Sequence, residues 1–181
     1  DKSRGWGVYY DFLNFYQDSP KVICMVRDLR DVFSSMEKQH RKAQKISSGI
    51  SNDVEMEGTT TAKRVDIWAK SQPVGLALDR LHQVLLENHP ILFVKYEDLT
   101  KNPQTELDRI YDYLGVPKHK HNFTEVKQIT EEDDNVYGGA IDHTIRENVK
   151  ALPSDYDDVL GKQTADNIKK AYPWFYETFG Y

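Results

Sequence analysis

The feature that most constrains the fold is an apolar run, Val22 to Val26, which stops abruptly at Arg27. Five consecutive apolar residues are typical of a strand buried on both faces, as in a parallel sheet. Acidic residues and then apolar residues at helical spacing follow, which predicts a helix over about Asp31–Lys45. A buried strand that leads directly into a helix indicates the α/β class.

Arg27 lies where this strand is predicted to end, and open α/β sheets bind ligands at the carboxyl ends of their strands. Its guanidinium offers a rigid fork of donors, and Ser35, eight residues later, adds a hydroxyl from the helix. With the amides of the helix amino terminus, these groups predict a site for a phosphate-like anion. The alternative is that Arg27 forms an ion pair at the rim of the sheet, with Asp28, Asp31 or Asp98.

The rest of the chain alternates between strand and helix patterns without internal repeats. This alternation predicts a parallel sheet flanked by helices and joined by right-handed crossovers. Residues 46–61 have no regular period and are rich in loop formers, so we expect an irregular loop that acts as a lid. The other expected elements are helices over 6–16, from about 61, over 74–88, 103–114 and about 163–171, and a strand over 91–95.

Two later blocks extend the pattern around Arg27 and Ser35. Tyr96-Glu97-Asp98-Leu99 follows the second strand and leads to Leu114-Gly115-Val116-Pro117, and the chain ends in the aromatic segment 174–181. In this order the blocks resemble the sulfotransferase superfamily, in its bacterial or phage-like members, which use 3′-phosphoadenosine-5′-phosphosulfate (PAPS). The resemblance covers most of the chain outside residues 41–61.

The resemblance implies a P-loop-containing nucleotide hydrolase-like fold in which Arg27 and Ser35 bind the 3′-phosphate of the nucleotide. It also implies that Tyr96 lies against the adenine and that Arg146, in His143-Thr144-Ile145-Arg146, returns to the 3′-phosphate. The alternatives are a half-buried tyrosine at a strand end and a solvated loop arginine. The reaction implied is transfer of a sulfuryl group from PAPS to a hydroxyl or amine, which leaves 3′,5′-adenosine bisphosphate.

The family also carries an amino-terminal strand and a loop for the 5′-phosphosulfate, and no matching segment precedes residue 1 in this sequence. We therefore expect residues 1–181 to form one domain, as a carboxyl-terminal portion of a longer protein. No histidine precedes His40, so the histidine base of some family members has no counterpart here. Lys2 and Asp11 are candidate catalytic residues, and the base is not assigned.

Composition narrows the class of protein further. A net charge of −5 argues against a general nucleic-acid binder, and one cysteine, Cys24, excludes an intrachain disulfide. Cys24 is expected to be a buried structural thiol. No run approaches the ~20 apolar residues of a membrane span, so we expect no membrane association and a cytoplasmic location. No cluster of residues has metal-ligand spacing, which predicts that no metal is bound.

The sequence leaves the acceptor open among a small molecule, a glycan and a peptide, and leaves the oligomeric state open. Two other function classes stay possible: a non-catalytic nucleotide-binding or scaffold domain, and a P-loop nucleotide kinase, which needs a Gly-rich Lys-Ser/Thr loop not seen here. The aromatic tail over 172–181 is expected to anchor the chain end in the core, against the helix over 6–16 or the sheet edge. The alternative is that it stacks on a cofactor or binds a partner.

Overall fold

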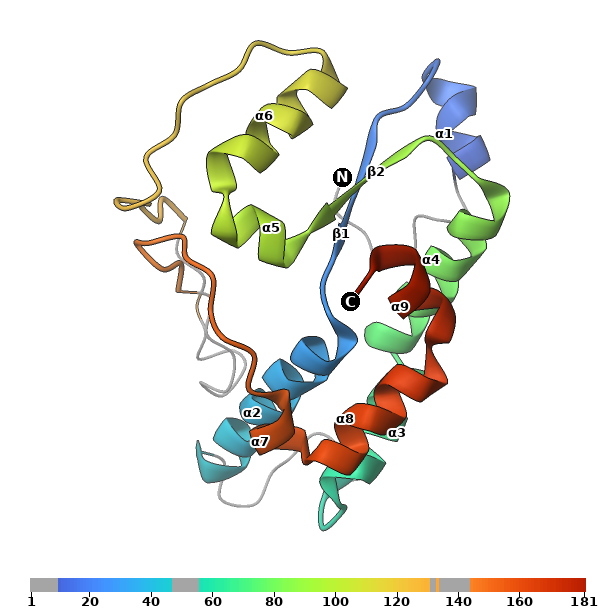
Figure 1. Cartoon of the computed structure of the whole chain (residues 1–181), viewed down its shortest axis with the longest axis vertical. Helices are drawn as coiled ribbons and strands as arrows, with labels where there is room; N and C mark the ends of the chain where they lie inside the picture. Colours follow the sequence, from blue (N-terminus) through green and yellow to red (C-terminus); the bar gives the residue numbers. More distant parts are fainter. Residues whose placement is uncertain (1–9, 47–55, 131–132, 134–143) are drawn as a thin grey trace.

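Two parallel strands lie at the centre of the structure, a computed structural model that describes residues 10–46, 56–130, 133 and 144–181 (Figure 1). They are β1 (Val22–Val26) and β2 (Ile91–Lys95), paired so that Val22 lies opposite Ile91 and Val26 opposite Lys95. Both strands have the predicted bounds. The α/β class, with a parallel sheet flanked by helices, is confirmed.

The long helices also follow the sequence pattern, whereas three short ones were not predicted. The helix over Pro103–Leu114 has its predicted bounds, and the others begin or end within a few residues of the expected positions. Helices of five to seven residues carry too few turns to show a hydrophobic period, so α5, α7 and α9 gave no signal. The helices are α1 (Tyr10–Tyr16), α2 (Leu29–Ile46), α3 (Thr61–Lys70), α4 (Val74–Glu87), α5 (Tyr96–Lys101), α6 (Pro103–Leu114), α7 (Tyr156–Leu160), α8 (Lys162–Ala171) and α9 (Pro173–Phe179).

Local chemistry explains where these helices begin and end. The Asp28 carboxylate accepts a hydrogen bond from the backbone N–H of Arg30 at 2.9 Å, which caps α2 directly after β1. The Thr60 hydroxyl accepts from the N–H of Lys63 at 3.2 Å and caps α3 in the same way. Gly115 ends α6 with a φ of 72°, a left-handed conformation that glycine adopts without a Cβ penalty.

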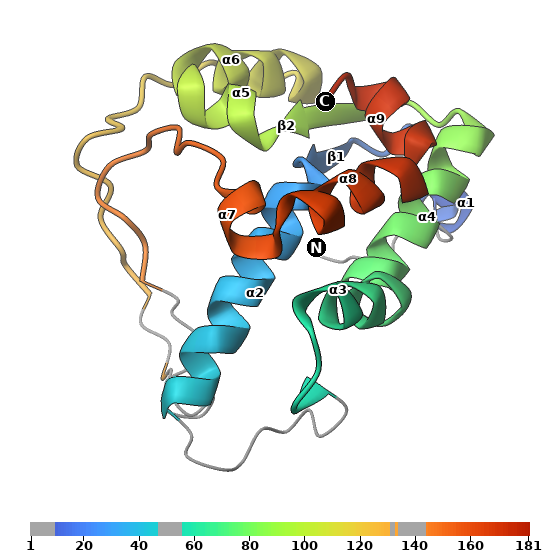
Figure 2. The ribbon, with the colours of Figure 1, turned by 60° about the horizontal axis from the view of Figure 1, so that its bottom comes forward.

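The helices lie on both sides of the strands, with α5 and α6 on one side and α4 and α9 on the other (Figure 1). Figure 2 shows that α2, α3, α7 and α8 gather beyond the carboxyl end of β1. The main apolar core lies between the strands and these helices. Its buried members are Val26, Leu29, Phe33, Met56, Val65, Trp68, Val74, Leu78, Leu160, Ile168, Phe175, Tyr176 and Phe179.

The two faces of the sheet are covered unequally. Phe93 of β2 packs against Phe179 of α9, with 5.3 Å between ring centroids, and Val94 on the opposite face is fully buried. Met25 of β1 is 50% exposed, so the prediction that β1 is buried on both faces is wrong at this position among the described residues. Among the described residues β1 pairs with β2 alone, so it is an edge strand rather than a central one.

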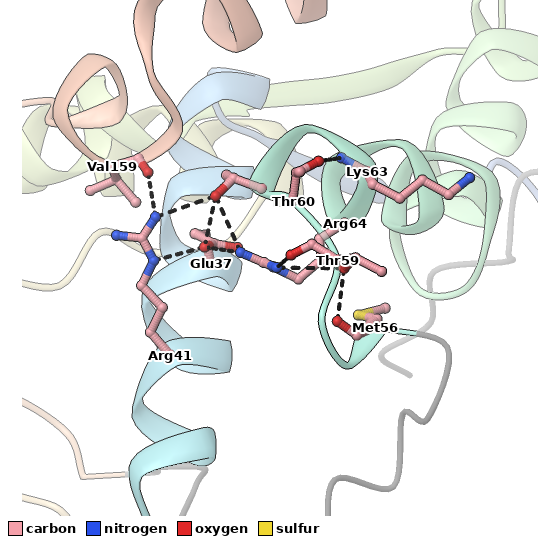
Figure 3. Close-up of polar contacts among 9 residues, drawn as sticks. Glu37, Arg41, Met56, Thr59, Thr60, Lys63, Arg64 and Val159 are labelled. Carbon is pink, nitrogen blue, oxygen red and sulfur yellow. Dashed lines mark hydrogen bonds and ion pairs between the residues drawn. The ribbon is translucent and has the colours of Figure 1, made fainter.

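A buried carboxylate ties α2 to α3 and α7 (Figure 3). The Glu37 side chain is 0% exposed and accepts hydrogen bonds from Arg64, at 2.6 and 2.8 Å, and from Arg41 Nε at 2.7 Å. Arg41 also donates to the backbone oxygen of Val159, and Arg64 to that of Thr59. Burial opposes ionisation of Glu37, but the two arginines hold the pKa of its carboxyl below the usual value. The network therefore fixes the helix that follows Arg27.

The regions predicted to be irregular are only partly described. Of residues 46–61, Ile46 ends α2, the side chain of Met56 is buried in the core, and α3 begins at Thr61. Residues 47–55, and with them most of the proposed lid, lie outside the described residues. The described part of 118–148 contains no helix or strand, although Val126 N–H donates to Glu147 O and Val149 N–H to Phe123 O, each at 2.8 Å.

The aromatic tail is anchored in the core, as the structural interpretation predicted. Phe175 and Phe179 are 1% and 6% exposed, and the tail reaches the sheet through Phe93. The described residues show no hydrogen bond or ring contact between the tail and α1. In the described part of the chain, no helix is long and apolar enough to cross a membrane.

Candidate functional site

Arg27 and Tyr96 meet at the carboxyl ends of the two strands. Val26 pairs with Lys95, so the next residue of each strand emerges at the same edge of the sheet. The Cζ atom of Arg27 lies 4.5 Å from the centroid of the Tyr96 ring, within the range of a cation–π contact. The ring thus covers one face of the guanidinium, and the N–H groups at the edges of the guanidinium stay available to an acceptor.

The Arg27 guanidinium has no hydrogen-bond or ion-pair partner within the described residues. Its Nε is buried there without an acceptor. The alternative prediction, an ion pair with Asp28, Asp31 or Asp98, is therefore wrong for the described structure. Because buried donors are normally satisfied, a free fork at a ligand-binding edge indicates an anion site.

Asp28 is engaged by other donors. Its carboxylate accepts from Arg30 Nε at 3.0 Å and from the Tyr176 hydroxyl at 3.0 Å. Burial opposes ionisation of Asp28, but the bonds from Arg30 and Tyr176 hold the pKa of its carboxyl below the usual value. Burial and the Asp28 carboxylate together raise the pKa of Tyr176.

Two other carboxylates near Arg27 are also engaged. Asp31 accepts from the Ser154 hydroxyl at 2.7 Å, and burial raises the pKa of its carboxyl despite that bond and the charge of Arg27. Glu97 accepts from the backbone N–H of Asp28 at 3.3 Å and from the Tyr181 hydroxyl at 2.7 Å. Burial, and then the bond to Glu97, raise the pKa of Tyr181, so this hydroxyl stays a donor.

Ser35 and its neighbour Ser34 point to different surroundings. Ser34 is 1% exposed and donates to Asp155 at 2.7 Å, whereas Ser35 is exposed and makes no hydrogen bond with the described residues. Ser35 is six residues after Leu29, the first residue of α2, which places it about 9 Å along the helix. Its hydroxyl is accessible to a ligand, and its role with Arg27 stays a prediction.

The structure does not bring Arg146 into contact with Arg27. Arg146 is exposed and has no ion pair or hydrogen bond among the described residues. Its segment pairs instead with residues 123–128, since Ile145 N–H donates to Gln128 Oε1 at 2.7 Å. Its role at the 3′-phosphate stays a prediction.

Of the two candidate catalytic residues, the structure describes only Asp11, which does not lie at this edge. Lys2 lies outside the described residues. Asp11 is exposed in α1, and the preceding residue of α1, Tyr10, lines a pocket of about 350 Å³ with Lys21 and Pro90, which precede the two strands. Asp11 therefore belongs to the amino ends of the strands. Among the described residues, no group of three or more His, Cys, Asp or Glu side chains could hold a metal ion.

The sequence interpretation missed the donors that hold the three carboxylates. Arg30 and Ser154 belong to no motif, and Tyr176 and Tyr181 were noted only as members of the aromatic tail, without a role for their hydroxyls. A tyrosine at the end of an aromatic cluster usually buries its ring and keeps a bonded hydroxyl, and this was the only signal available.

Comparisons with known proteins identify one family. A family model described as a sulfotransferase domain matches residues 10–155, which include Arg27, Ser35, Tyr96 and Arg146. Searches of the curated proteins and of the solved structures return no significant match.

Proposed function

Because the chain belongs to the sulfotransferase domain family, we propose that it transfers a sulfuryl group from PAPS to a hydroxyl or amine acceptor. Family membership supports a sulfotransfer function, and hence a transferase, in general. The nucleotide donor and the class of acceptor, whether a small molecule, a glycan or a peptide, belong to the proposal.

The observation that carries the proposal is the free guanidinium of Arg27 above the Tyr96 ring, at the ligand-binding edge of a parallel sheet. A phosphate monoester accepts bidentate hydrogen bonds from such a fork. In the proposed complex, Arg27 and Ser35 hold the 3′-phosphate, Tyr96 lies near the adenine, and Arg146 is a second cation for the phosphate.

In this arrangement Arg27 binds and orients the donor rather than acting on the sulfuryl group. Sulfuryl transfer resembles phosphoryl transfer in that the acceptor must be aligned and the charge developing on the leaving phosphate stabilised. A nucleotide held firmly at its 3′-phosphate presents the other end to the acceptor in a fixed orientation. Lys2 stays a candidate for the remaining catalytic roles, whereas Asp11 does not, because it lies at the amino ends of the strands.

Calorimetry with two nucleotides tests the proposal. We expect 3′,5′-adenosine bisphosphate to bind the full-length protein much more tightly than 5′-AMP, because only the former carries a 3′-phosphate. Hydrogen bonds to charged groups contribute about 1.5–3 kcal/mol each, so Arg27→Ala is expected to lower the affinity about tenfold or more. Equal affinities for the two nucleotides would overturn the assignment.

Arg80→Ala is a matched control for this experiment. Arg80 lies in α4 and, like Arg27, has a buried Nε without an acceptor among the described residues, so the two substitutions remove similar groups. We expect the control to keep its affinity for the nucleotide. Transfer of ³⁵S from labelled PAPS to a panel of phenols, glycans and peptides then separates an enzyme from a protein that only binds the nucleotide.

A further inference from the structure

Three carboxylates belong to the residues next to the Arg27–Tyr96 contact, and each of them has the chemistry to pair with the Arg27 guanidinium. Asp28 is the next residue, Asp31 interacts electrostatically with Arg27, and Glu97 directly follows Tyr96. An arginine and a carboxylate form a bidentate pair when geometry allows it. A pair of this kind would compete directly with an incoming phosphate for the same donors.

No such pair forms among the described residues, because each carboxylate is held by another donor. Tyr181 donates to Glu97 Oε2 at 2.7 Å, while Glu97 Oε1 accepts from the N–H of Asp28. Ser154 donates to Asp31 Oδ2 at 2.7 Å. The hydroxyls come from the last part of the chain, which returns to the strand ends beside β1 (Figure 1).

We propose that Tyr181 and Ser154 are positioning residues: they hold Glu97 and Asp31 away from Arg27 and so keep its guanidinium free for the phosphate of the ligand. The inference rests on the proposed function, since it explains how the arginine of the site proposed there stays unpaired with the carboxylates around it. Neither residue touches the ligand, and both act through a carboxylate.

The contacts predict how much each of the hydroxyls of Tyr176, Tyr181 and Ser154 contributes to nucleotide affinity. Asp28 keeps its ion pair with Arg30 when the Tyr176 hydroxyl is removed, so Tyr176→Phe is expected to have little effect on nucleotide affinity. Glu97 and Asp31 each depend on one side-chain hydroxyl among the described residues. Tyr181→Phe, which keeps the ring that contacts Phe175 and Lys95, is therefore the most informative variant.

A double-mutant cycle tests the inference. Tyr181→Phe is expected to weaken binding of 3′,5′-adenosine bisphosphate by about threefold or more, within the range of couplings measured inside one network. Glu97→Gln is expected to bind close to wild type, and the double variant Tyr181→Phe, Glu97→Gln to regain the affinity of Glu97→Gln. A merely structural role predicts instead that the two losses add.

The cycle has a second readout that needs no nucleotide. The ¹⁵Nε–Hε resonance of Arg27, assigned by its loss in Arg27→Lys, is expected to shift in ligand-free Tyr181→Phe, when Glu97 pairs with the guanidinium, and to return in the double variant. If wild type does not prefer the 3′-phosphorylated nucleotide, the proposed function fails, and the resonance still decides this inference.

Two results would overturn the inference: a double variant as weak as Tyr181→Phe, or a Tyr181→Phe protein with wild-type affinity and an unshifted Arg27 resonance. Melting temperatures are measured for every variant. If Tyr181→Phe does not fold, the same cycle with Ser154→Ala and Asp31→Asn tests the second hydroxyl, because the Asp31 carboxylate is then the one released.

Discussion

The guanidinium of Arg27 lies over the ring of Tyr96, with 4.5 Å between Cζ and the ring centroid. One residue follows β1 and the other follows β2, so the contact exists because the two parallel strands are in register. It joins the two blocks of sequence that carry the family motifs. It also orients the cation that we assign to the nucleotide phosphate.

The contact predicts that the ring of Tyr96 matters more than its hydroxyl. Tyr96→Leu removes the aromatic face and is expected to lower the affinity for 3′,5′-adenosine bisphosphate about two- to thirty-fold, because cation–π contacts contribute about 0.5–2 kcal/mol. Tyr96→Phe keeps the ring and is the control, with an affinity expected to stay near wild type. Calorimetry at fixed salt measures both, and equal losses in the two variants would assign the contribution to the hydroxyl.

Glu37 is predicted to be essential for stability at neutral pH. Glu37→Gln leaves Arg64 buried without its counter-charge and is expected to lower the free energy of unfolding by about 3–5 kcal/mol. Urea denaturation at pH 7 measures this loss. Glu177→Gln changes an exposed carboxylate of α9 in the same way and is expected to leave stability unchanged.

The difference in stability between wild type and Glu37→Gln is predicted to depend on pH, with a defined sign. The arginines hold the pKa of Glu37 in the folded state below its ordinary value of 4.5, so the unfolded chain takes up a proton first as the pH falls. The contribution of ionised Glu37 is therefore fully present above pH 4.5 and is lost as the pH falls through the folded-state pKa. The gap between wild type and Glu37→Gln should shrink below pH 4.5, and a gap that widens there contradicts the assignment.

Cys24 is predicted to react slowly while the protein is folded. Cys24 is half-buried rather than buried as expected, and this burial in β1 raises the pKa of its thiol from 9.0 to about 11, so far less thiolate is present at pH 8 than in the unfolded chain. Since the thiolate is the nucleophile and a more basic thiolate reacts somewhat faster, we expect about 10- to 100-fold slower reaction with 5,5′-dithiobis(2-nitrobenzoate). The rate in urea at the same pH is the reference, and similar rates in both conditions would show an accessible, reactive thiol.

The aromatic tail is predicted to be needed for folding. Phe175 is 1% exposed and lies 4.9 Å from the ring of Phe179, so Phe175→Ala is expected to lower the free energy of unfolding by about 3–5 kcal/mol. Deletion of residues 172–181 should lower the melting temperature further. Calorimetric melting measures both, with exposed Thr178→Ala as the control. A truncated protein that melts like wild type but does not bind acceptor would move the tail into the active site.

The sequence was sufficient to predict the strands, the longer helices and the position of Arg27 at the carboxyl edge of the sheet. An unbroken apolar run predicts a buried strand locally, and helical spacing over three or more turns predicts a helix, so neither needs knowledge of distant residues. Arg27 and Tyr96 could be expected at one edge because parallel strands end together. Short helices such as α7 were missed because their boundaries depend on packing rather than on a period.

Only the tertiary structure decided which charges are paired. The sequence offers Arg27 several carboxylates as partners, and their occupation by other donors depends on contacts such as Tyr181 with Glu97, 84 positions apart, and Ser154 with Asp31, 123 positions apart. In the same way, Ser34 and Ser35 look alike in sequence, yet Ser34 binds Asp155 and only Ser35 stays exposed. Hydrogen bonds depend on distances and angles that are set only in the folded chain. No local sequence pattern therefore indicates which donor binds a given carboxylate.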